Sequence, residues 1–283
     1  MFGYSRQRYY RSIKNTAKNK GRASLVVEMV RELRIQMPRL GARKLYFLLE
    51  PKLSKLGVGR EKLFKILKAN HLLIKPLKSY HKTTNSFHRF RKHKNLIEEM
   101  KLEKPEQLWV ADITYVGTRT NPMYLSLVTD AYSKRIVGYH LSRSLATEGS
   151  LIALQMGINK REYKGSSLIH HSDRGFQYCS DAYQKELSKN KIRCSMTESY
   201  DPYANAIAER INGILKQEFL AFIKTDEFSV MKQVISQSIN IYNDKRPHYS
   251  CNYNTPNYMH KQKQVKIKTY KSKNHFKNIL EVV

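Results

Sequence analysis

Apolar residues near the start of the chain recur at helical spacing in three short segments. These segments are residues 24–36, 42–49 and 60–70, and a glycine-containing turn precedes the last of them. Repeats of three and four positions are typical of helices that bury one face. The pattern predicts a small all-α domain of the helix-turn-helix type over residues 1–74. The alternative is a helical bundle with no bound partner.

From residue 108 onward the pattern becomes that of β-strands. Three runs rich in β-branched and aromatic residues, 108–118, 123–133 and 135–142, follow one another with short links. Such runs predict an antiparallel meander. Helices and strands then alternate, as helix 147–161, strand 166–173, helix 181–189, strand 192–199 and helix 201–218. This order predicts an α/β fold with a mixed sheet flanked by helices.

The charge of the chain indicates the kind of partner that it binds. The formal net charge is +29, and the first 100 residues carry 25 basic and 6 acidic side chains. An excess of this size favours a polyanion through counterion release, and nucleic acid is the expected one. The lysines of the third helix, Lys62, Lys65 and Lys68, lie opposite its apolar face. We expect them to contact DNA, although a solvated lysine face is the alternative.

Other features of the sequence bear on DNA binding, on the cell compartment and on membrane association. Residues 75–94 are densely basic without apolar periodicity, and predict an extended arm that follows phosphates, or else a solvated linker. The three cysteines lack metal-ligand spacing, which predicts a reducing cytosol and no zinc site. With no 18-residue apolar run and no signal peptide, we expect no membrane partner.

Three acids stand where chemistry could use them. Asp112 lies within a strand, Asp173 ends another, and Glu209 is on the last helix. Carboxylate oxygens are the ligands that Mg²⁺ prefers. Each acid has a structural alternative in an ion pair or a turn, and Asp130 is a rival at the end of the second strand. Around Glu209, one helix face gathers Asn205, Asn212, Gly213 and Lys216.

Four blocks of the sequence resemble a known family. They are QLWVADITYV, HHSDRGFQYCS, NAIAERINGILKQEF and YNDKRPHYSCNYNTPNYM. Together they are similar to the second-frame (OrfB) product of insertion sequence 3 family transposases, whose core is of the retroviral-integrase type. The 35 residues between Asp173 and Glu209 match the spacing of that family. The start SRQRYYRSIK and the segment PRLGARKL resemble its N-terminal part less specifically.

The resemblance implies a ribonuclease-H-like core with a five-stranded sheet at residues 107–259. A basic linker arm at 75–106 would precede it, and a basic tail at 260–283 would follow. It also implies a catalytic triad of Asp112, Asp173 and Glu209 that holds two Mg²⁺ ions, for which Mn²⁺ could substitute. Water would free a 3′-OH at each end of the element, and that 3′-OH would attack a second phosphodiester.

The implied partners are double-stranded DNA at the element's terminal repeats and target, further copies of the chain, and an upstream first-frame product. The implied location is the bacterial cytoplasm, at the nucleoid. Candidate DNA contacts beyond the three lysines are Arg89, Arg91, Lys92, Arg174, Asn205, Asn212, Lys216, Arg246 and His248. For Arg246 and His248, packing on the core is the alternative. The alternative functions are a nuclease that cuts without joining and a catalytically silent DNA-binding regulator.

Overall fold

The computed structural model describes residues 5–75, 77, 93–97, 100–118, 120–197 and 206–267. The chain divides into two compact units. One comprises residues 1–79 with 217–221, and the other comprises 80–216 with 222–283. The short segment 217–221 therefore groups with the helical unit, although the sequence places it within the predicted core. Among the described helices, none has the length and hydrophobicity of a membrane-spanning segment.

The first unit is built from three helices. These are α1 (Arg6–Gln36), α2 (Ala42–Lys55) and α3 (Arg60–Ala69). Their buried side chains include Val26, Val30, Leu45, Leu53, Leu63 and Leu67. The helices predicted at 42–49 and 60–70 are present, and α2 continues six residues further than expected. Segment 217–221 contacts the helices of this unit through an ion pair. Its Glu218 Oε1 lies 3.1 Å from Lys44 Nζ of α2.

Helix α1 is much longer than its apolar pattern predicted. It begins at Arg6, where the Ser5 hydroxyl accepts a hydrogen bond of 3.3 Å from the Arg8 amide. Such a cap satisfies one of the free N–H groups at a helix start. Residues 5–21 are all exposed. The pattern missed this part of the helix because its side chains are exposed, and exposed positions need no apolar stripe.

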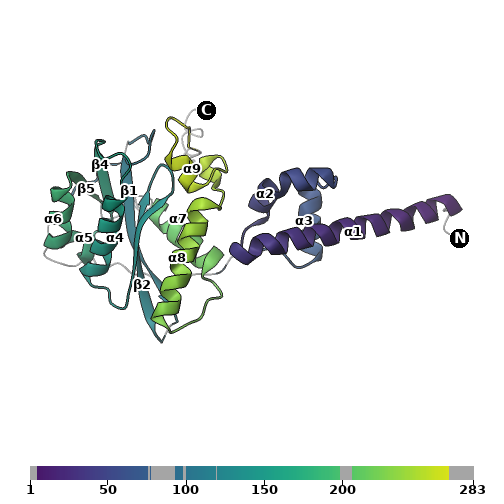
Figure 1. The fold of residues 1–283 in the computed structure, drawn as a ribbon, viewed down its shortest axis with the longest axis horizontal. Helices are drawn as coiled ribbons and strands as arrows, with labels where there is room; N and C mark the ends of the chain where they lie inside the picture. The colour runs from purple at the N-terminus through teal and green to yellow at the C-terminus, as the bar shows by residue number, and fades with distance from the viewer. Residues whose placement is uncertain are drawn as a thin grey trace, which may run out of the picture. The chain divides into compact units, whose positions relative to one another are not determined.

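The second unit contains a mixed sheet of five strands, as predicted. The strands are β1 (Leu108–Gly117), β2 (Pro122–Asp130), β3 (Ile136–Ser142), β4 (Leu168–Ser172) and β5 (Ile192–Met196), in the order β3-β2-β1-β4-β5 (Figure 1). The meander β1-β2-β3 is antiparallel, whereas β4 and β5 run parallel to β1. This arrangement is the ribonuclease-H-like sheet that the resemblance implied.

Helices cover the sheet. They are α4 (Thr147–Asn159), α5 (Phe176–Cys179), α6 (Asp181–Lys189), α7 (Ala206–Ile214), α8 (Phe228–Asp244) and α9 (Pro256–His260). The helix predicted at 201–218 is wrong at its C-terminal end, because α7 stops at Ile214 and a π-helical turn, Leu215–Phe219, follows. The first five residues of that prediction lie outside the described residues.

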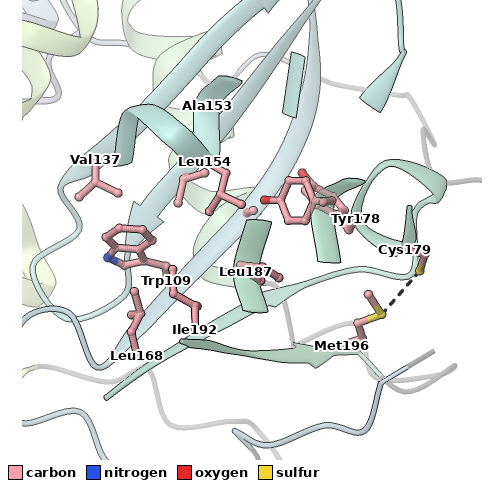
Figure 2. Close-up of a cluster of buried hydrophobic side chains, with 13 residues drawn as sticks. Trp109, Val137, Ala153, Leu154, Leu168, Tyr178, Cys179, Leu187, Ile192 and Met196 are labelled. Atoms are coloured by element: carbon pink, nitrogen blue, oxygen red, sulfur yellow. Dashed lines mark hydrogen bonds between the residues drawn. The ribbon is translucent and has the colours of Figure 1, made fainter. Parts of the chain in front are cut away.

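The main core lies between the sheet and helices α4 to α6. Figure 2 shows the Trp109 indole, which is fully buried, near Val137, Leu168 and Ile192. Helix α4 approaches β3 so closely that a Cβ at Gly138 would lie 2.0 Å from the Ala153 carbonyl oxygen. Only glycine therefore fits at position 138 without moving the helix.

Alternation along β1 decides which way its acid points. Trp109 and Ala111 belong to the core beneath α4, whereas Leu108 and Val110 pack with Ala208 of α7 on the other face. Successive side chains of a strand point to opposite faces. Asp112 therefore faces the side of the sheet that α7 covers.

A buried polar network lies beside the start of β1 and the end of β2. Glu106, 1% exposed, accepts hydrogen bonds from Arg161 Nε at 3.1 Å and from two backbone N–H groups at 2.8 and 3.1 Å. Asp130 accepts from the Ser133 hydroxyl at 2.6 Å and from the Glu106 amide at 2.7 Å. His260 of α9 lies 3.6 Å from Glu106 and 3.7 Å from Asp130. The Asp130 carboxylate is thus part of a structural hydrogen-bond network at the end of β2.

The network predicts a pH-dependent stability. Burial alone would lower the pKa of His260, but Asp130 and Glu106 outweigh it and raise that pKa above its usual value. A raised folded-state pKa stabilises the protein fully below about pH 6.5 and loses its effect as pH rises through the folded value. We expect His260→Gln to cost about 1.5–3 kcal/mol at pH 6, the range for hydrogen bonds to charged groups, and less at pH 9. Thermal unfolding at both pH values tests this, and an equal loss at both would show that packing, not charge, is responsible.

Candidate active site

Asp112 is held in the middle of the central strand. Its Oδ1 accepts a hydrogen bond of 2.8 Å from the Ile113 amide, and its Oδ2 accepts one of 2.7 Å from the Asn212 side-chain amide. Strand β1 lies between β2 and β4, so its position is fixed from both sides. The carboxylate is therefore oriented by neutral donors.

Asp173 follows directly after β4. The register pairs Val110 with His171, and continuing it by two positions brings Asp173 level with Asp112. Its Oδ1 accepts a hydrogen bond of 3.0 Å from the Gly175 amide. A Cβ at position 175 would lie 3.0 Å from that same oxygen, so glycine lets the turn close around the carboxylate.

Glu209 and Asn212 come from one turn of α7. Ala208, Ile211 and Asn212 are buried against the sheet, and Glu209 is exposed beside them. The contact between Asn212 and Asp112 places this turn over the middle of β1. Lys216 follows in the π-helical turn and is half-buried. Burial lowers the pKa of its ammonium group, and the charge of Asp112 opposes that shift.

The three acids are near enough to affect one another. The pKa of Asp112 is raised from 3.8 to about 7 by burial, which is the largest cause, by the charge of Asp173, and by a smaller contribution from Glu209. The hydrogen bonds from Asn212 and Ile113 act in the opposite direction. Like charges that share a site disfavour each other's ionised form. The structure therefore brings the three predicted acids together in one negatively charged region.

The predicted DNA contacts fall into different environments. Lys65 and Lys68 are exposed on α3, Lys62 is partly exposed, and Arg174 is partly exposed next to Asp173. Their contact with DNA stays a prediction, as does that of Lys216. Four further candidates, Arg89, Arg91, Lys92 and Asn205, lie outside the described residues.

Three other candidates are buried. Asn212 is 4% exposed, Arg246 1% and His248 8%. Asn212 faces Asp112 rather than the surface. For Arg246 and His248 the described surroundings match the packing alternative, since both lie beside the Tyr242 ring at the end of α8. The arrangement of side chains around the helix axis did not predict the burial of Asn212. It gives the angular position of each side chain, but not the side of the helix on which the sheet lies.

One structural role in the last block could not be read from the sequence. The Asn243 side chain at the end of α8 bonds the backbone of Ile136 twice, with its Oδ1 accepting and its Nδ2 donating, both at 3.0 Å. It thereby satisfies backbone groups at the edge strand β3. Tyr242 donates a hydrogen bond of 2.8 Å to the Lys134 carbonyl oxygen. This part of the block therefore attaches α8 to the sheet.

Comparison with known proteins identifies the family of the chain. An integrase core domain family matches residues 103–202, and a second family of the same description matches residues 190–256. The insertion element IS600 uncharacterized 31 kDa protein of Shigella sonnei is 32% identical over 254 residues, which span 88% of this chain and 92% of that protein. The transposase InsF for insertion sequence IS3A of Escherichia coli (strain K12) is 33% identical over 159 residues, 56% of this chain and 55% of that protein.

The chain belongs to the insertion sequence 3 family of transposases. Its function is that of a DNA transposase with an integrase-type core, a polynucleotidyl transferase. A chain of the simian T-cell lymphotropic virus intasome in complex with PP2A regulatory subunit B56 gamma aligns with a TM-score of 0.49 and 19% identity, over 82% of this chain and 78% of that chain.

The donor chemistry of the transposase site fits a divalent cation. All three acids offer carboxylate oxygens, and the raised pKa of Asp112 marks an excess of negative charge that a cation would relieve. Within the described residues, no three Asp, Glu, His or Cys side chains already stand as a metal-binding group.

This fit predicts a pH-dependent stabilisation of the transposase by metal. A cation binds the ionised carboxylates, so Mg²⁺ or Mn²⁺ should raise the thermal midpoint more at pH 8 than at pH 6, because the pKa of Asp112 is about 7. Asp112→Asn should lose most of the metal-dependent rise. Asp181→Asn, which removes an acid from the start of α6 on the other face of the sheet, is the matched control and should keep it. Equal shifts in wild type and Asp112→Asn would exclude Asp112 as a ligand.

Proposed function

We propose that Asp112, Asp173 and Glu209 are the catalytic carboxylates of this transposase, and that it both cleaves and joins DNA at the ends of its element. In the first reaction a water oxygen forms a bond to phosphorus, and the bond from phosphorus to the 3′-oxygen breaks, which frees a 3′-OH. In the second, that 3′-oxygen bonds a new phosphorus, and the 3′-oxygen of the target strand leaves. No covalent enzyme intermediate forms.

The observation that carries the proposal is the meeting of three acids from separate elements around one buried carboxylate. Asp112 comes from the central strand, Asp173 from the end of β4 and Glu209 from α7, and both neighbours raise the pKa of Asp112. A structural ion pair would instead lower a carboxyl pKa, as happens at Glu106, where His260 and Arg161 bring it to about 2 despite burial. Carboxyl pKa values that are strongly raised by burial together with a neighbouring like charge are typical of functional sites.

Two Mg²⁺ ions, with Mn²⁺ as a substitute, complete the proposed site. When bound, they would supply Lewis-acid stabilisation of the charge on the reacting phosphate. The chain's own residues position the Asp112 carboxylate and a DNA phosphate. Asn212 fixes the Asp112 carboxylate through its amide, and Lys216 offers a half-buried positive charge beside it for a DNA phosphate.

The wider proposal concerns the partners. The substrate is duplex DNA at the terminal repeats and at the target. Copies of the chain assemble on that DNA, since joining two ends to one target requires two sites. An upstream first-frame product of the same element takes part in recognising the ends.

The first test removes one acid at a time. Asp112→Asn, Asp173→Asn and Glu209→Gln should each reduce strand joining by about 10³-fold or more, a loss of about 4 kcal/mol of transition-state stabilisation, while DNA binding persists. Glu227→Gln, an exposed acid before α8, is the control and should keep activity. Outward-facing PCR across the abutted ends of the element measures joining in cells, and a gel with labelled duplex measures cleavage.

The outcomes separate the alternatives. Joined ends from wild type alone support the proposal. Cleaved but unjoined DNA from wild type would indicate a nuclease, and binding without either product would indicate a silent regulator. Joined ends from Glu209→Gln at the wild-type level would remove Glu209 from the triad.

The proposal also assigns Asn212 a positioning role. Removing its amide takes away the 2.7 Å hydrogen bond that favours the ionised form of Asp112. Asn212→Ala should therefore raise the pKa of Asp112 and move the acidic limb of the pH–rate profile to higher pH at fixed Mg²⁺. Asn212→Gln, which keeps the amide, should recover part of the rate. A lower rate with an unchanged pH profile would indicate a packing defect instead.

A further inference from the structure

The first half of α1 contributes no buried side chain to its own unit. Figure 1 shows this part of the helix projecting beyond α2 and α3. Residues 5–21 are exposed, and the buried positions of the helix begin at Val26. A helix that supports a fold normally buries one face, so this projecting half is available to a partner.

The charges of this half of the helix are all of one sign. Seven basic residues and no acid lie between Arg6 and Arg22. Like charges that crowd along one helix repel each other. A polyanion would relieve that repulsion and favour the helical form.

The side chains are sorted around the helix axis. At about 100° per residue, every residue from 6 to 22 that falls in one sector of about 100° is Arg, Lys or Asn. In angular order, the members of this sector are Lys18, Arg11, Arg22, Asn15, Arg8 and Asn19. We call it the Arg/Asn face. Arg and Asn are the side chains that form paired hydrogen bonds with guanine and adenine edges, and Lys and Arg also contact phosphates.

The Arg/Asn face adjoins the third helix. Lys62 of α3 donates a hydrogen bond of 3.4 Å to the Asn19 side chain, which lies at the edge of that face. Lys65 and Lys68 of α3 are exposed. The projecting helix and α3 therefore meet at the edge of the Arg/Asn face within one unit.

We infer that residues 6–22 of α1 form a second DNA-binding element, which lays its Arg/Asn face into the major groove of a duplex beside the site of α3. At 1.5 Å per residue the segment is about 25 Å long, and the major groove admits an α-helix. This inference rests on the DNA function of the chain and adds a surface to it.

Pairing with a second copy is the competing use of this helix. The opposite side carries Tyr9, Tyr10, Ile13 and Ala17, but Arg6 and Lys20 lie among them. Two copies would bring like charges together along the seam. DNA is therefore the better match, and self-association becomes an outcome of the test.

The test compares three full-length variants that each lose three positive charges. Arg8→Gln/Arg11→Gln/Lys18→Gln alters the Arg/Asn face. Arg6→Gln/Lys14→Gln/Lys20→Gln alters the same helix outside that face. Lys185→Gln/Lys189→Gln/Lys191→Gln alters exposed lysines within and just after α6 in the other unit. Fluorescence anisotropy with a random-sequence duplex of about 40 base pairs measures affinity against salt concentration.

We expect the face variant to bind about 10- to 100-fold more weakly near 150 mM salt, with a slope of log K against log salt that is smaller by about 2–3. The two control variants should lose less affinity and retain more of the slope. Amide hydrogen exchange should also show that DNA protects residues 6–22 in wild type.

An equal loss in all three variants, or none in the face variant, would overturn the inference. Self-association that Ile13→Asp abolishes, with the face variant binding DNA normally, would assign this helix to a second copy of the chain. Strand joining by wild type is measured separately, so a failure here leaves the catalytic proposal intact. A wild type that binds no DNA would instead overturn the proposed function.

Discussion

An acidic side chain in the middle of a β-sheet, Asp112, is the constraint around which the catalytic unit is arranged. The pKa of Asp112 rises from 3.8 to about 7, which corresponds to a cost on the order of 4 kcal/mol for its charged form in the folded state. A domain of this size has a total stability of only about 5–15 kcal/mol. The sheet tolerates the charge because β1 is central, with strands on both sides and a core of fully buried side chains beneath it.

Two sites along β1 treat acids in opposite ways. At the start of β1, Asp130 and Glu106 are surrounded by donors and by a histidine of raised pKa, and they stabilise the fold. Two residues beyond Val110, Asp112 has two neutral donors and two acidic neighbours. This contrast explains why Asp130, which the sequence offered as a rival, takes no part in the candidate site. Its carboxylate oxygens are already occupied by the Ser133 hydroxyl and backbone amides.

Much of this arrangement could be predicted from the sequence, and the failures have physical causes. Strands β1 to β3 carry runs of apolar, β-branched and aromatic side chains, so their positions follow from the sequence pattern, and the acids follow from the resemblance. The first half of α1 was missed because an uncovered helix carries no apolar stripe. The π-helical turn after Ile214 was missed because one inserted residue leaves no local signal. The burial of Asn212 depends on which face of α7 meets β1, which only the tertiary structure determines.

The donors that orient Asp112 are informative because neither of them is a cation. An arginine at position 212 would also hold the carboxylate, but it would neutralise the charge and lower the pKa, as Arg161 helps to do at Glu106. An amide fixes the oxygen at 2.7 Å and leaves the negative charge in place. The nearby Lys216 is half-buried, and burial weakens its hold on a proton. A site whose acids are positioned but not neutralised keeps its charge for a positively charged ligand, which a purely structural cluster would have no reason to do.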